Sequence, residues 1–218
     1  MKIAILGGSF NPIHIGHLIL ADFVCTELNY DKVLFIPVYN PPHKEMNLSI
    51  DDKDRLEMVK LAVKNDPRFE VESCELDRGG ISFTWDTVCY LEEKYKNLLT
   101  GKIGLIIGSD LLNNFDKWKN SEKLASKCDL ILATRSKDFE TDSSFANKAK
   151  GLFVDDSIKL SEDFFQFEYK KLSNPMVSIS STDIRARINK GKAWRYLVCE
   201  EVFNYIEKRK LYGFNSYK

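Results

Sequence analysis

Short apolar runs alternate along the chain with segments in which apolar residues recur at helical spacing. The fully apolar runs predict buried parallel strands at 3–6, 33–37, 102–107 and 129–133. Two weaker runs predict strands at 69–72 and 176–179. The helical spacing predicts helices at 15–28, 49–65, 84–95, 110–115, 121–126, 182–189 and 199–209. Repeated strand–helix alternation favours an α/β fold built on a doubly wound parallel sheet, with helices on both faces.

The chain has 218 residues and shows no repeat, low-complexity tract or linker that would divide it. We therefore expect a single domain over residues 1–218. In open α/β sheets, ligands bind beyond the carboxyl ends of the strands. The segments that follow the predicted strands should consequently meet in one cleft, and they are 7–17, 38–44, 108–110, 134–136 and 180–185.

The first of these segments, residues 7–17, reads GGSFNPIHIGH and is here called the phosphate loop. Glycines between a strand and a helix let backbone N–H groups approach a phosphate closely. His14 and His17 are three residues apart, so they share one face of the helix that follows. The segment contains neither the dinucleotide G-x-G-x-x-G pattern nor a Walker A loop. The pattern indicates chemistry on a phosphate through hydrogen bonding and charge.

A second candidate anion site opens the helix predicted near residue 182. Ser180, Ser181 and Thr182 offer three hydroxyl groups that can cap the helix and hydrogen-bond an anion. Arg185 adds a guanidinium on the adjoining turn, which suits phosphate oxygens. An ordinary N-cap with a surface arginine is the alternative, and the phosphate loop at the other end of the chain argues against it.

Other polar residues follow predicted strands or begin helices. Asn40 and Lys44 lie on a proline-rich loop, where Lys44 either pairs with a phosphate or is a solvated turn residue. Asp110 either binds ribose hydroxyls or caps a helix, and the two roles can coexist. Arg135 is a candidate for phosphate binding. All of these would lie at the same edge of the sheet.

Trp118 lies among charged residues and is a candidate stacking platform, with a place in the core as the alternative. Thr84 and Asp86 open a predicted helix and either cap it or contact a ligand. Neither interpretation is favoured at this point.

The composition narrows the classes of partner and compartment. Lysine and arginine total 32 and the carboxylates total 32, which predicts neither a nucleic-acid-binding nor a membrane-surface protein. The five cysteines include no C-x-x-C pair, so we expect no zinc site but free, mostly buried thiols. We expect no signal peptide, and the sequence contains no 18-residue apolar stretch. We expect a cytoplasmic protein, and the sequence leaves a homo-oligomer open.

The two motifs carry a family resemblance. The phosphate loop resembles the G-S-F-x-P-x-H-x-G-H signature of the nucleotidylyltransferase superfamily, and Ile179–Arg185 resembles its I-S-S-T-x-I-R signature. Residues 40–44, 83–87, 108–110, Trp118 and 211–213 are similar to segments of the bacterial nicotinate-mononucleotide adenylyltransferases. The resemblance spans nearly the whole chain and implies a Rossmann-like fold.

The resemblance implies an adenylyltransferase that joins the AMP moiety of ATP to nicotinate mononucleotide in NAD biosynthesis, giving deamido-NAD and pyrophosphate. Mg²⁺ would arrive with the ATP, and the C-terminal helices at about 180–210 would complete the ATP site. The implied catalytic residues are His14, His17, Lys44 and Arg185. The implied ATP-binding residues are Gly8, Ser9, Phe10, His17, Gly108, Asp110, Ile179, Ser180, Thr182 and Arg185. The implied substrate-binding residues are Asn40, Lys44, Thr84, Asp86, Trp118 and Arg135.

By the same resemblance, Thr84 and backbone N–H groups near Trp118 would bind the pyridine carboxylate, with the indole stacked on the ring. This would favour the acid over the amide, because a carboxylate only accepts hydrogen bonds and an amide also donates them.

Two positions depart from the family pattern. Asn11 stands where the family usually has aspartate, and we expect it to keep a hydrogen-bonding role in the loop. Cys199 stands where a proline often opens the last helix, which affects packing more than chemistry.

Two alternatives stay open on the sequence. One is an adenylyl- or cytidylyltransferase for another phosphate, such as phosphopantetheine or glycerol phosphate. The other is a nucleotide-binding regulator without turnover.

Overall fold

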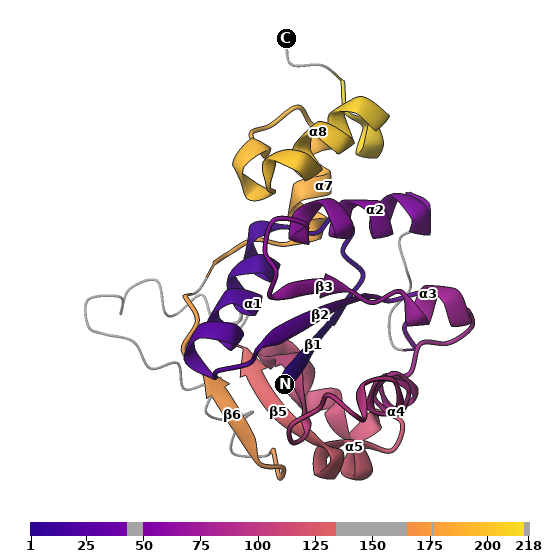
Figure 1. The fold of residues 1–218 in the computed structure, drawn as a ribbon. Coiled ribbons are helices and arrows are strands. Elements are labelled where there is room, and N and C mark those ends of the chain that lie inside the picture. Colours follow the sequence, from indigo (N-terminus) through magenta and orange to yellow (C-terminus); the bar gives the residue numbers. More distant parts are fainter. Residues whose placement is uncertain (43–49, 134–164, 176, 216–218) are drawn as a thin grey trace.

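The structure is a computed structural model and describes residues 1–42, 50–133, 165–175 and 177–215. Six strands in these ranges form one all-parallel sheet with the order β3-β2-β1-β4-β5-β6 (Figure 1). The strands are β1 (Ile3–Gly8), β2 (Lys32–Pro37), β3 (Phe69–Val71), β4 (Ile103–Gly108), β5 (Cys128–Ala133) and β6 (Tyr169–Leu172). The chain builds one side of the sheet from β1 to β3 and then returns to start β4 on the other side of β1. The α/β fold with a doubly wound parallel sheet is confirmed.

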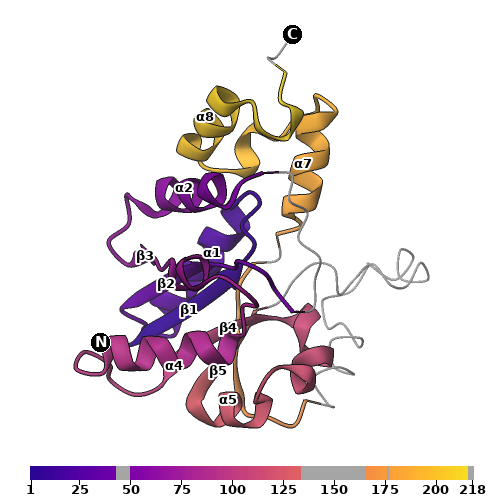
Figure 2. The same ribbon diagram turned by 90° about the vertical axis from the view of Figure 1, so that its right-hand side faces the viewer.

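Helices connect and extend these strands. They are α1 (Ile15–Glu27), α2 (Asp52–Val63), α3 (Cys74–Arg78), α4 (Thr84–Tyr95), α5 (Ser121–Lys127), α7 (Ser181–Asn189) and α8 (Glu200–Arg209). The described residues also contain the 3₁₀ segments η1 (Ser109–Lys117), η4 (Arg195–Leu197) and η5 (Leu211–Gly213). Helices α1, α2, α7 and α8 lie on one face of the sheet, and α4 and α5 lie on the other (Figures 1 and 2).

The two faces have separate hydrophobic cores because side chains alternate along each strand. Ala4 and Leu6 of β1 point into the core beneath α1, α2, α7 and α8. Ile3 and Ile5 point into the core beneath α4 and α5. Both cores are continuous with buried residues of the helices that cover them, so β1 is apolar at every position between Ile3 and Leu6.

The parallel arrangement brings the carboxyl ends of all six strands to one edge. Strand β1 pairs with β2 through register pairs that run to Gly8 and Pro37, and with β4 through Ala4–Gly104 and Ile5–Leu105. The sheet therefore has its topological switch point between β1 and β4, where ligands bind in open α/β sheets. The phosphate loop begins there.

Several boundaries differ from the sequence predictions. The last strand is β6, and residues 177–179 form no strand, while Met176 lies outside the described residues. Strand β6 pairs only with β5 at the edge of the sheet, and two of its four residues are exposed lysines, so its apolar signal is weak. Helix α3 was not predicted. Asp51, whose side chain accepts from the Lys53 N–H, caps α2 in place of the expected Ser49, which lies outside the described residues.

All five cysteines are free, and Cys25, Cys74 and Cys128 are buried. Burial raises the pKa of the Cys25 thiol to about 11 and of the Cys74 and Cys128 thiols to about 12. These thiols are therefore neutral at physiological pH and serve as core residues. Within the described ranges, no helix is both long and apolar enough to cross a membrane.

Candidate active site

The phosphate loop turns directly from β1 into α1. The carbonyl of Gly8 accepts from the Val38 N–H at 3.0 Å, and His14 is the N-cap residue of α1. The backbone N–H of His14 donates to Nδ1 of His17 at 3.2 Å. Because Nδ1 accepts this bond, the proton of a neutral His17 ring is on Nε2. The fold therefore makes the Nε2 atom of His17 a hydrogen-bond donor at the start of α1.

The two imidazoles lie together at this helix start. Their rings stack with centroids 3.7 Å apart, and His14 and His17 are 8% and 9% exposed. Gly16 makes room for this stack, because a Cβ atom there would lie 3.1 Å from Nδ1 of His14. Phe10 is fully buried, and its ring meets His17 edge-on at 5.0 Å. Phe10 thus supports the histidine with its side chain, so its predicted contact with ATP would have to come from its backbone.

Helix α7 binds the phosphate loop from the C-terminal part of the chain. Ser181 donates its hydroxyl to the Pro12 carbonyl at 2.9 Å, and Arg185 donates Nη1 to the Asn11 carbonyl at 2.7 Å. Ser180 is the N-cap, as predicted, and its side chain accepts from the Asp183 N–H at 3.1 Å. Thr182 accepts from Nη2 of Arg185 at 3.3 Å. The two predicted anion sites are therefore adjacent and joined by hydrogen bonds.

Arg55 of α2 binds the same loop from inside the molecule, and sequence reasoning missed it. It is 1% exposed and donates to the Ser9 carbonyl at 2.7 Å and to the Val38 carbonyl at 2.8 Å. Its charge is paired with Asp52 one turn earlier. The carbonyl and N–H of a trans peptide point in opposite directions, so Arg55 aims the Phe10 N–H away from itself.

The loop after β2 is tied to the start of α4 by Ser82. The backbone N–H groups of Tyr39 and Asn40 donate to Oγ of Ser82 at 3.2 and 3.3 Å, and the Ser82 N–H donates to the Asn40 carbonyl at 2.8 Å. Ser82 is buried and Asn40 is exposed. These bonds bring Asn40 next to Thr84, which begins α4. The two predicted substrate residues therefore lie close together.

A second group of residues lies at the start of α4 and the end of η1, and we name Phe83, Asp86, Trp118 and Lys119 the tryptophan cluster. Nζ of Lys119 contacts both carboxylate oxygens of Asp86 at 2.9 Å and lies 4.7 Å from the centre of the Phe83 ring. Trp118 is half-buried, its ring packs on that of Phe115 with centroids 5.2 Å apart, and its backbone N–H donates to the Phe115 carbonyl. The cluster joins the start of α4 to the end of η1.

The remaining predicted site residues lie near strand ends, near α7, in η1 or outside the described residues. Gly108 ends β4 at the switch-point edge, and Ile179 packs against the core beneath α7. Gly8 closes β1, and Ser9 follows it with its carbonyl bound to Arg55. Asp110 lies in η1, but its side chain is outside the described part of the structure. Lys44 and Arg135 lie outside the described residues.

The donor set at this edge consists of imidazole, guanidinium, hydroxyl and backbone N–H groups, which favour anions. Across the described ranges, no three His, Cys, Asp or Glu residues are grouped so that they could hold a metal ion.

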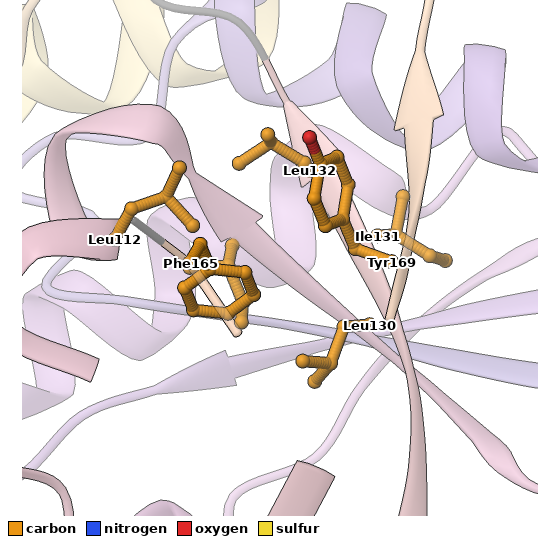
Figure 3. A pocket seen from close by; sticks show the side chains of 7 residues that line it. Leu112, Leu130, Ile131, Leu132, Phe165 and Tyr169 are labelled. Carbon is orange, nitrogen blue, oxygen red and sulfur yellow. The ribbon is translucent and has the colours of Figure 1, made fainter. Parts of the chain in front are cut away.

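A separate recess lies between η1, β4, β5 and the segment around Phe165. Leu112, Leu130, Leu132 and Phe165 point toward one another there (Figure 3). It leaves no room for a water molecule, and most of its lining is aliphatic or aromatic carbon. This recess is a feature of the core and offers nothing that would bind a phosphate.

The fold and site define a nucleotidyltransferase-type protein, and the comparisons with known proteins agree. Residues 5–187 match the cytidylyltransferase-like family model, and the chain belongs to that family. It is 39% identical over 97% of its length to a Borreliella afzelii protein named "Probable nicotinate-nucleotide adenylyltransferase", with 97% of that protein covered. A Treponema pallidum protein of the same name is 37% identical, with coverage of 97% of this chain and 99% of the relative.

A solved structure shares the fold across nearly its whole length. The Plasmodium falciparum nicotinic acid mononucleotide adenylyltransferase complexed with NaAD aligns with a TM-score of 0.72. The alignment covers 98% of each chain at 21% identity, a level at which the likeness concerns the fold.

Proposed function

We propose that this protein transfers the AMP moiety of ATP to nicotinate mononucleotide, forming deamido-NAD and pyrophosphate in NAD biosynthesis. The observation that carries the proposal is the hydrogen bond from the His14 N–H to Nδ1 of His17. It provides an Nε2 donor beside a glycine-rich loop, in a chain whose curated relatives carry this enzyme name.

In the reaction, a phosphate oxygen of the mononucleotide attacks the α-phosphorus of ATP. A new P–O bond forms, and the bond from the α-phosphorus to the bridging oxygen breaks. The bonding electrons leave with pyrophosphate. The nucleophile is already an anion, so no covalent enzyme intermediate is needed. Catalysis then rests on alignment and on donors that offset the charge of the transition state.

The residues at the switch point divide this work. His17 would donate from Nε2 to an α-phosphate oxygen, and the Phe10 N–H would add a second donor. Ser180, Thr182 and Arg185 would hold the β- and γ-phosphates that leave, beside the loop to which α7 is bonded. Lys44 and Arg135 stay sequence-based predictions for neutralising phosphate charge.

Mg²⁺ enters this proposal as part of the MgATP substrate. The described residues hold no carboxylate cage for it, so its ligands would be triphosphate oxygens and water. Chelation should stop turnover and leave the melting temperature unchanged.

The tryptophan cluster would receive the nicotinate ring. The indole of Trp118 is half-buried, so part of its surface is open to a ligand. The pyridine carboxylate would lie near Thr84 and the first turn of α4, whose N–H groups and helix dipole favour an anion. Asp86 would repel that carboxylate, but Lys119 neutralises it. This arrangement would favour the acid over the amide.

We also propose that the C-terminal helices from about residue 180 complete the ATP site within one domain, because α7 supplies Arg185 and Ser181 to the phosphate loop. The five free cysteines support the expectation of a reducing, cytoplasmic environment.

The test is pyrophosphate release by the purified protein with MgATP and either nicotinate mononucleotide or nicotinamide mononucleotide. We expect rapid release with the acid and little with the amide. Equal release with both would keep the chemistry and refute the proposed recognition of the carboxylate. No release with either, but release with phosphopantetheine or glycerol phosphate, would replace the acceptor. No release with any acceptor would indicate a nucleotide-binding regulator.

A further inference from the structure

Tyr212 reaches the phosphate loop from the 3₁₀ segment η5, 201 positions along the chain from the residue it contacts. Its hydroxyl donates to Oδ1 of Asn11 at 2.7 Å, and the tyrosine side chain is buried. Burial raises the pKa of Tyr212, so its phenol stays protonated and remains a donor over the physiological pH range. Asn11 therefore receives a hydrogen bond that does not change with pH between 6 and 9.

Asn11 connects this tyrosine to the candidate ATP residues. Its side chain accepts from Tyr212, and its own carbonyl accepts from Nη1 of Arg185 at 2.7 Å. One residue thus receives bonds from η5 through its side chain and from α7 through its main chain. Movement of the Asn11 side chain would be transmitted to the position of the guanidinium.

The backbone has an uncommon conformation on both sides of this contact, at Tyr212 and at the residue before Asn11. Tyr212 has φ 58° and ψ 23°, and Phe10, next to Asn11, has φ 44°. Non-glycine residues in this region cost energy and persist where the surroundings hold them in place. Gly213 packs closely on α7, since a Cβ there would lie 3.0 Å from Nδ2 of Asn189. The η5 segment is therefore seated against the helix that carries Arg185.

We propose that Tyr212 is a positioning residue for the ATP half of the site, which holds Asn11 and, through it, Arg185 where the triphosphate binds. The inference rests on the proposed function, and it assigns a role to the Leu211–Gly213 segment that the chemistry itself does not use. Loss of the Tyr212 hydroxyl should weaken the binding of ATP and leave the binding of the acceptor substrate unchanged.

The chain offers a matched control in Tyr205 of α8. Its hydroxyl donates to Oδ1 of Asp54 at 2.7 Å, and burial raises its pKa to about 12, with the Asp54 carboxylate adding to the shift. Tyr205 and Tyr212 therefore both donate a 2.7 Å bond from the C-terminal part of the chain. Asp54 lies on α2 and belongs to neither predicted anion site.

The experiment compares Tyr212→Phe and Tyr205→Phe with the unaltered protein. The readouts are the KM for each substrate, the Kd for α,β-methylene-ATP by calorimetry, and the melting temperature. For Tyr212→Phe we expect the ATP KM and the analogue Kd to rise about tenfold, with the nicotinate mononucleotide KM within twofold. Tyr205→Phe should lower the melting temperature similarly and leave all three constants unchanged.

A double-mutant cycle identifies the route of the effect. Asn11→Ala alone should raise the analogue Kd, and adding Tyr212→Phe should raise it no further, because both changes remove the same contact. If the two changes raise the analogue Kd additively, the proposed coupling through Asn11 is refuted.

Other outcomes would refute either this inference or the proposed function. Equal rises in both KM values, or an ATP KM that matches Tyr205→Phe, would reduce Tyr212 to a structural residue and refute the inference. A protein that binds the analogue but releases no pyrophosphate would refute the proposed function, and the Kd ratio would then decide this inference alone. A protein that does not bind the analogue would refute both.

Discussion

The phosphate loop and the tryptophan cluster are held in different ways. The phosphate loop receives buried or half-buried hydrogen bonds from α2, α7 and η5, through Arg55, Ser181, Arg185 and Tyr212. The tryptophan cluster is joined by the Asp86–Lys119 ion pair at the surface and by the contact of Lys119 with the Phe83 ring, while Trp118 packs on Phe115. The part of the site that would perform the reaction is thus built into the core, and the part that would choose the acceptor lies at the surface.

This difference matches what each half has to do. Transition-state stabilisation depends on donors whose positions are set before the substrate arrives. Choice of acceptor depends on a few contacts that can change without disturbing the fold. If the two halves are separate, a change in one half should leave the substrate constants of the other half unaltered.

The largest effect should come from His17. His17→Asn keeps an oxygen that can accept from the His14 N–H but removes the donor at the Nε2 position. We expect kcat to fall by about 10²–10³, with the nicotinate mononucleotide KM unchanged. Steady-state kinetics of pyrophosphate release measure this. A kcat within tenfold of the unaltered protein would show that the Nε2 donor is not used.

The next largest effect should be on stability, at Arg55. Arg55→Met leaves the half-buried Ser9 and Val38 carbonyls without their donor, which should cost about 2–4 kcal/mol of unfolding free energy. We expect the melting temperature to fall by about 5–15 °C. Arg68→Met is the control, because its ion pairs with Asp22 and Asp66 are at the surface and should contribute about 1 kcal/mol or less. Equal losses in the two variants would contradict the importance of the buried bonds.

A smaller and more selective effect is expected in the tryptophan cluster. Lys119→Met leaves the Asp86 carboxylate unneutralised near the proposed nicotinate position, so the nicotinate mononucleotide KM should rise about 3–10-fold. The ATP KM and the melting temperature should hardly change. Lys117→Met, two residues earlier on the exposed surface, should leave both constants unaltered. A rise in the ATP KM for Lys119→Met would show that the halves are coupled.

The smallest effect is expected at Arg187, which we compare with Arg185 on the same helix. Arg187 pairs with Asp183 one turn away at the surface, and Arg187→Met should change the unfolding free energy by about 0.5 kcal/mol or less with no change in the ATP KM. Arg185→Met, by contrast, should raise the ATP KM, because Arg185 is bonded to the phosphate loop. Substrate titrations of both variants make the comparison. Equal ATP KM values in the two variants would show that Arg185 does not contribute to ATP binding.

The elements that could be predicted from the sequence are those with a strong local signal. The strands β1, β2, β4 and β5 are apolar at nearly every position because helices cover both faces, and the N-cap at Ser180 follows from its hydroxyl. The last strand was misplaced because half of β6 is exposed lysine. Val177 and Ile179, which suggested a strand at 176–179, lie in the approach to α7.

Contacts between distant segments could not be predicted from local patterns. Sequence reasoning assigned no role to Arg55, although its place on a helix with Met58 and Val59 is a weak signal of burial. The Tyr212–Asn11 bond joins residues 201 positions apart and has no signature in spacing or charge. The histidines, serines and arginine of the site could be predicted from sequence motifs. The residues that hold them in place could be identified only in the folded structure.

The bond between Tyr212 and Asn11 also has a meaning for how the protein is made. Asn11 is synthesised 201 residues before the tyrosine that binds it. A nascent chain can form β1 and β2 early, but its nucleotide-binding loop stays without this partner until η5 has been made. A polypeptide that stopped before Tyr212 would contain both histidines but would lack one of the bonds that hold the loop. Such a chain should bind ATP more weakly than one that includes η5.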